Sequence, residues 1–182
     1  MLFMRIWELT HCEMNYAVFT PEEKWSIDYI QSFNGSRKSE NWIPLFLVLD
    51  QPESEHPLND FPGFQYTSFI IFSSKATGIL MPLIQKDAEL LPLKFRNDEY
   101  YGINVTSVLS CIDYDKSIYK CFKSSGRIMK FYSVAFRKNG VKGHHIFRLT
   151  EGPRIYYVSD DFKNMVEKNG LTGFAFKLIW EG

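Results

Sequence analysis

The sequence predicts an α+β fold that is rich in strands and has short helices. Aromatic residues make up 16% of the 182 residues, and aromatic side chains favour β-strands. The apolar segments are short, and a unit of strand, serine, helix and strand occurs twice. A chain of this length buries enough surface to form a core without disulfides or a structural metal. We therefore expect one domain spanning residues 1–182.

The amino-terminal part is predicted to contain one helix and three strands, at residues 3–7, 16–19 and 42–49. The nearly continuous apolar character of the third strand predicts burial on both of its faces. The helix is expected to begin at Thr20-Pro21, because a hydroxyl N-cap followed by proline favours a helix start. It is expected to end at Asn34-Gly35-Ser36. The proline-rich, acidic segment 51–63 is predicted to be a loop.

The repeated unit is the most specific local pattern. Its first copy runs from a strand at residues 69–72 into Ser73 and a helix. Its second copy runs from a strand at residues 155–158 into Ser159 and a helix that ends at Asn169-Gly170. Each serine is predicted to be the N-cap of its helix, where its hydroxyl accepts a backbone hydrogen bond. Both copies then return to an extended segment, at residues 90–93 and 173–178.

Further strands are predicted between the two copies, at residues 100–105, 128–136 and 146–149. The helix of the first copy is expected to end at Pro82, because proline cannot donate a backbone hydrogen bond. The sequence leaves open whether the two copies pack as a symmetric pair.

Charge and cysteine content exclude several classes of protein. The 21 Lys and Arg residues balance 21 Asp and Glu residues, so no overall positive field favours nucleic acid or an anionic membrane. The cysteines Cys12, Cys111 and Cys121 have no CxxC spacing, and we expect free thiols in a reducing compartment. No apolar segment approaches the roughly 20 residues of a membrane helix, and the amino terminus lacks a signal-peptide pattern. A cytoplasmic protein is predicted.

The residues that could carry chemistry favour structural roles. Neither Ser73 nor Ser159 lies in a Gly-x-Ser-x-Gly elbow, so neither is predicted to be a nucleophile. His144 and His145 have no further ligands at metal spacing. The segment 170–173 follows a helix instead of preceding one, unlike a phosphate-binding loop. We expect no catalytic residue, no metal and no cofactor.

A series of short motifs follows the chain in a fixed order: Trp42-Ile43-Pro44, Asp60-Phe61-Pro62, Glu89-Leu90-Leu91-Pro92, Asn104-Val105, Ile146-Phe147-Arg148-Leu149 and Gly170-Leu171-Thr172-Gly173. In this order the motifs resemble immunity protein family eleven of bacterial polymorphic toxin systems. The similarity is best over residues 60–178 and loose over residues 1–59. It implies a non-enzymatic protein that binds and neutralises a cognate toxin, encoded by a neighbouring gene.

The acidic loops are the expected contact sites if such a toxin has a basic cleft, because opposite charges speed encounter. The candidate toxin-binding residues are therefore Glu53, Glu55, Asp113 and Asp115.

Two other classes of function are weighed against an inhibitor. An enzyme that reverses a toxin's modification, or another hydrolase, is the alternative, and it would need a base close to a nucleophile. The stoichiometry of protection separates these two classes, because an inhibitor must match the toxin mole for mole. A nucleic-acid binder is less favoured, since Arg137, Lys138 and Lys142 form only a small basic cluster.

Overall fold

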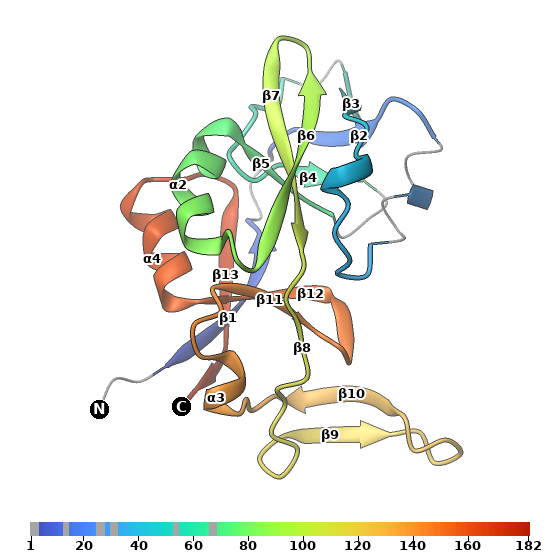
Figure 1. Cartoon of the computed structure of the whole chain (residues 1–182), viewed down its shortest axis with the longest axis vertical. Coiled ribbons are helices and arrows are strands. Elements are labelled where there is room, and N and C mark those ends of the chain that lie inside the picture. The colour runs from blue at the N-terminus through green and yellow to red at the C-terminus, as the bar shows by residue number, and fades with distance from the viewer. Residues whose placement is uncertain (1–3, 13–14, 25–27, 30–32, 53–54, 66–68) are drawn as a thin grey trace.

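The computed structural model describes residues 4–12, 15–24, 28–29, 33–52, 55–65 and 69–182. These residues form two mixed β-sheets, short helices and a separate β-hairpin (Figure 1). The predicted α+β class, rich in strands with short helices, is confirmed. None of the helices among the described residues is long and apolar enough to cross a membrane.

Five strands form the first sheet, in the spatial order β13-β1-β12-β11-β8. Their bounds are Arg5–His11 for β1, Val108–Leu109 for β8, Ile146–Leu149 for β11, Gly152–Ser159 for β12 and Phe174–Glu181 for β13. Strand β1 lies between β12 and β13 and is antiparallel to both. The first strand of the chain is therefore held by the last two.

Six strands form the second sheet, in the spatial order β4-β2-β3-β6-β7-β5. Their bounds are Val18–Pro21 for β2, Leu45–Leu49 for β3, Gly63–Phe64 for β4, Ile70–Ser73 for β5, Ala88–Phe95 for β6 and Asp98–Val105 for β7. Strand β7 lies between β5 and β6 and is antiparallel to both.

The repeated unit of the sequence has one topology in both sheets. In the first copy, helix α2 (Ser74–Ile84) connects β5 to β6, with β7 between these parallel strands. In the second copy, helix α4 (Asp160–Lys168) connects β12 to β13, with β1 between them. Both copies are therefore split β-α-β units. Helices α2 and α4 pack side by side (Figure 1).

Apolar side chains of both copies meet in one core. Buried residues of the first copy and of the second form a single cluster, which includes Phe72, Ala76, Leu80, Ile84, Val158, Phe162 and Val166. Complete burial of a large apolar side chain stabilises a fold by roughly 1.5–3 kcal/mol. A second cluster, around Phe19, Leu45 and Leu93, belongs to the six-stranded sheet.

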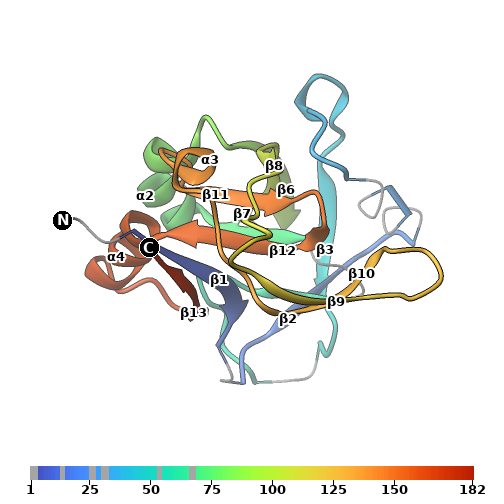
Figure 2. The same cartoon turned by 90° about the horizontal axis from the view of Figure 1, so that it is seen from below.

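Strands β9 (Ile118–Cys121) and β10 (Ile128–Ser133) form an antiparallel hairpin that belongs to neither large sheet. The hairpin lies below the rest of the molecule in Figure 1, and in the view from below its connecting turn reaches the edge of the outline (Figure 2). Its base is held by a third core cluster, where Phe131 and Val134 pack against buried residues such as Phe136. Helix α3 (Lys138–Val141) follows this base, and the short 3₁₀ helix η1 (Ser39–Asn41) precedes β3.

The predicted start of the amino-terminal helix is wrong. Thr20 and Pro21 extend strand β2 and pair with Val48 and Leu47 of β3. The completely buried side chain of Phe19 fixes this strand in the core, and the tertiary contact outweighs the local capping pattern. Asp28 and Tyr29 are helical, and much of the remaining predicted helix lies outside the described residues.

Two further local predictions are corrected. Strand β3 is not buried on both faces, because Leu45 and Leu47 are buried whereas Phe46 is 55% exposed. At β3 the sheet therefore has one buried face, towards the cluster around Phe19, and one exposed face. Pro82 does not end its helix but lies inside α2, which continues to Ile84. The complete burial of Ile84 offsets the backbone hydrogen bond that proline cannot make.

Candidate functional site

The predicted toxin-binding acids lie in separate places. Glu53 is outside the described residues, and Glu55 is exposed in the connection between β3 and β4. Asp113 and Asp115 lie in the connection from β8 to β9, where Asp113 Oδ2 is 3.4 Å from Lys116 Nζ. Strands β3 and β4 lie towards the opposite end of the molecule from β8 and β9 (Figure 1). Glu55 therefore lies apart from Asp113 and Asp115.

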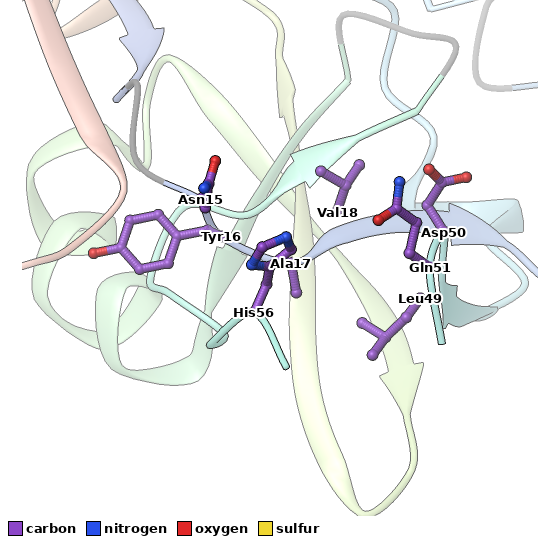
Figure 3. A pocket seen from close by; sticks show the side chains of 8 residues that line it. All are labelled: Asn15, Tyr16, Ala17, Val18, Leu49, Asp50, Gln51 and His56. Carbon is purple, nitrogen blue, oxygen red and sulfur yellow. The ribbon is translucent and has the colours of Figure 1, made fainter. Parts of the chain in front are cut away.

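A polar pocket of about 300 Å³ lies beside the segment that contains Glu55 (Figure 3). It is lined by residues before and within β2 and by the segment after β3: Asn15, Tyr16, Ala17, Val18, Leu49, Asp50, Gln51 and His56. His56 lies in the middle of the labelled side chains, with Asp50 and Gln51 to one side (Figure 3). The acidic loop that contains Glu55 thus borders a polar concavity.

Three motif segments converge on the carboxylate of Asp60, which is buried. Ser73 Oγ donates to Asp60 Oδ1 at 2.7 Å, and Thr172 N donates to Oδ2 at 2.9 Å. Ser73 Oγ also accepts from Ala76 N at 3.1 Å, so this serine is the N-cap of α2. Asp60 therefore connects the start of α2 to the loop that follows α4.

Hydrogen bonds hold Asp60 in its charged form. Burial alone would raise the pKa of Asp60. The hydrogen bonds from Thr172 and Ser73, together with the charge of Lys75 at 3.6 Å, outweigh burial and lower this pKa below its ordinary value.

A second buried carboxylate, Glu89, fastens the segment before β3 to the six-stranded sheet. Its Oε1 accepts from Lys38 N at 2.5 Å and from Asn104 Nδ2 at 2.7 Å. Asn104 Nδ2 also donates to the backbone oxygen of Ser36 at 2.9 Å. Burial would raise the pKa of Glu89, but the hydrogen bonds from Asn104, Lys38 and Ser39 outweigh it and lower this pKa. The polar motif residues described so far thus stabilise the fold through internal hydrogen bonds.

A serine and a histidine that are distant in the sequence also meet. His145 Nδ1 is 2.9 Å from Ser159 Oγ, which accepts from Phe162 N at 3.2 Å as the N-cap of α4. Nearby, His144 Nδ1 is 2.6 Å from Oδ1 of the fully buried Asp87. The backbone N–H of His145 donates to the other oxygen of the same carboxylate at 2.8 Å.

The Ser159–His145 pair does not have the geometry of a catalytic triad. In a triad, the histidine contacts serine through one ring nitrogen and the carboxylate through the other. Here the same atom, His145 Nδ1, faces both Ser159 Oγ and Asp161 Oδ2, the latter at 3.8 Å. The pair instead ties the start of α4 to the segment before β11.

The β9–β10 hairpin is the most exposed apolar part of the described chain outside the sheets. Its exposed large side chains are Ile118, Tyr119, Phe122, Met129 and Tyr132. Tyr114, at the base, donates to Glu151 Oε1 at 2.6 Å, and this hydrogen bond raises the pKa of Tyr114 to about 12. The sequence predicts a strand here but does not reveal the exposed surface, because the alternation of apolar and polar residues in 128–136 is imperfect. The signal available was the absence of Asp and Glu between Lys116 and Thr150.

Comparison with known proteins gives one family. No curated protein matches the chain. The model of the immunity protein family (Imm11) matches residues 87–180, which is more than half of the chain. The matched part contains Asn104, Ser159 and Thr172, whose internal contacts are described above. This protein therefore belongs to the immunity protein family Imm11.

Proposed function

We propose that this protein neutralises a partner toxin by binding it mole for mole, without chemistry of its own. Membership of the Imm11 family supports a role in immunity to a toxin. The observation that supports binding without catalysis is that the polar motif residues form hydrogen bonds within the fold. Ser73 and Thr172 donate hydrogen bonds to Asp60, and Asn104 donates one to Glu89. Because the hydrogen-bonding groups of these residues stabilise the fold, they are not available for catalysis, and this favours an inhibitor that acts through its surface.

The partner we propose is the toxin encoded by a neighbouring gene, and a titration tests the mechanism. The protein is added in increasing amounts to that toxin's carboxy-terminal domain, and residual toxin activity is measured. Protection should rise linearly and become complete at an equimolar ratio. Complete protection at a few hundredths of an equivalent would contradict the proposal, because only a catalyst acts on many toxin molecules.

An enzyme that reverses the toxin's modification is the second candidate, and the Ser159–His145 contact of 2.9 Å is the observation that favours testing it. The variants Ser159→Ala and His145→Gln separate the two functions. An inhibitor retains full equimolar protection in both variants, whereas an enzyme using this pair loses protection in both.

The acidic residues Glu53, Glu55, Asp113 and Asp115 are a proposed contact surface for a toxin with a basic cleft. Replacing all four with Lys should then weaken toxin binding and reduce its dependence on salt. An unchanged affinity and an unchanged salt dependence would remove these residues from the interface.

A further inference from the structure

The β9–β10 hairpin, defined as residues 116–133, exposes large apolar side chains that do not contribute to the core of the protein. Ile118 and Tyr132 are 62% and 63% exposed, and three more large apolar side chains of the hairpin are exposed beside them. Several large apolar side chains exposed on one element are typical of an interaction site. The contacts that anchor the hairpin come from its base, through Phe131 and Val134. Apart from Tyr119, whose ring packs against Tyr114 and Phe131, the exposed side chains lie outside the core cluster that anchors the base.

The charge of the hairpin has one sign. It carries Lys116, Lys120, Lys123, Arg127 and Lys130 and has no Asp or Glu. Lys116 pairs with Asp113, but no ion pair joins the other four cations to a carboxylate among the residues described. Because the whole chain is neutral, the rest of the molecule is net negative. Positive charge is therefore concentrated on a projecting hairpin.

Two of these cations, Lys120 and Lys130, are unfavourable for the stability of the hairpin because they repel each other. Lys120 and Lys130 are directly opposite one another across the two strands. Like charges at opposite positions of an antiparallel pair are unfavourable, and a carboxylate at either position would be better for the hairpin itself. Lys130 Nζ also lies 5.3 Å from the centre of the Tyr132 ring. A negatively charged partner would relieve the repulsion between the two lysines.

We propose that the β9–β10 hairpin is the docking element for the toxin and that it enters an acidic groove with apolar walls. In this arrangement, which rests on the proposed function, Ile118 and Tyr132 are apolar anchors and Lys120 and Lys130 meet carboxylates of the toxin. Of the five exposed large side chains of the hairpin, Ile118 and Met129 are aliphatic. Bases stack on aromatic rings and gain little from isoleucine or methionine, so these two side chains favour a protein over a nucleic acid as the partner. The partner's contact surface is thus opposite in charge to the one that the acidic loops would require.

The substitution Lys120→Glu tests the proposal with two readouts that move in opposite directions. It creates a Glu–Lys pair across the strands, so the melting temperature should stay equal or rise. It removes a contact with an acidic partner, so affinity for the carboxy-terminal toxin domain of the neighbouring gene should fall about tenfold or more by calorimetry. The variant Tyr132→Ser, which changes an exposed side chain, should weaken binding similarly while the protein stays folded.

The matched control is Lys168→Glu, which makes the same charge change at an exposed position of α4. Its affinity should equal that of the unchanged protein. Equal affinity of all three variants would overturn the hairpin proposal, while binding by the unchanged protein would still support the proposed function. Failure of the unchanged protein both to bind and to protect would instead overturn the proposed function and, with it, the docking proposal.

A nucleic-acid partner is distinguished in the same experiment. A 20-nucleotide single-stranded RNA of mixed sequence is used as the probe at several salt concentrations. The proposal expects no displacement of the toxin domain by this RNA. Displacement that is lost in Lys120→Glu would overturn the protein-docking proposal in favour of a nucleic-acid surface.

Discussion

At the scale of single residues, Asp60 is the point where motif segments 112 residues apart in the sequence meet. Replacing it with Asn keeps the size but removes the charge that Ser73 Oγ and Thr172 N stabilise. Hydrogen bonds to a charged group contribute about 1.5–3 kcal/mol, so we expect Asp60→Asn to lower the free energy of unfolding by that order in urea titrations. Asp98 is exposed and lines a surface pocket together with Asp60, so it provides the control, and Asp98→Asn should have little effect.

The lowered pKa of Asp60 also predicts a dependence of stability on pH. A carboxyl whose pKa is lower in the folded state stabilises the fold above its unfolded pKa, which is about 3.9 for Asp. That contribution is lost as the pH falls towards the lowered value. Urea titrations should therefore show a steeper loss of stability in acid for the unchanged protein than for Asp60→Asn. The variant should still show the acid-dependent loss of stability that arises from Glu89, whose pKa is also lowered.

The ring of Phe69 explains why strand β7 has a glycine, Gly102, in its interior. A Cβ atom added at this position would lie 2.1 Å from Cζ of Phe69, so the ring occupies the space of a side chain. Gly102→Ala should destabilise the protein by about 1–3 kcal/mol, the usual cost of an overpacked core.

Gly78 provides an internal control for this prediction. A Cβ atom there meets nothing within 4 Å, and the residue lies inside helix α2. Gly78→Ala should stabilise the protein by about 0.5–1 kcal/mol, because alanine is the better helix former. Thermal melts of the two variants should shift in opposite directions, and a shift in the same direction would contradict this account of β7.

At the scale of elements, the two serine caps have different surroundings. Ser159 Oγ accepts from Phe162 N and contacts His145, whereas Ser73 Oγ accepts from Ala76 N and donates to Asp60. Ser159→Ala should lower the free energy of unfolding by about 1 kcal/mol, the typical contribution of an N-cap. Ser73→Ala should cost more, because it also removes a hydrogen bond to a charged carboxylate. Equal effects in chemical denaturation would show that the Asp60 contact adds no stability.

The repeated unit could be predicted because its determinants are local. A serine before an apolar helix and Asn169-Gly170 after it specify where the second helix begins and ends, and Gly170 has the positive φ of 58° that favours glycine. The strand between the outer strands of each unit could not be predicted. Strand β1 enters the second unit from the opposite end of the chain, and no local pattern in residues 155–178 records this pairing.

At the scale of the whole molecule, the two sheets share one core. The cluster that contains Phe72 and Leu80 of the first unit also contains Val158 and Phe162 of the second. We expect one cooperative unfolding transition, in agreement with one domain over residues 1–182, because neither unit can lose this core alone. Near-ultraviolet circular dichroism, tryptophan fluorescence and calorimetry should give the same midpoint. Two separated transitions would contradict the prediction.

The sequence by itself determined the strand-rich α+β class, the two units and the family resemblance, because strand propensity, capping chemistry and motif order are properties of neighbouring residues. The tertiary structure decided which motif residues meet at Asp60, that Thr20-Pro21 is a strand, and that Ser159 contacts His145. It also placed five cations and the exposed apolar side chains on one projecting hairpin. These features depend on contacts between residues far apart in the chain and on the solvent exposure of side chains. Local sequence patterns determine neither of them.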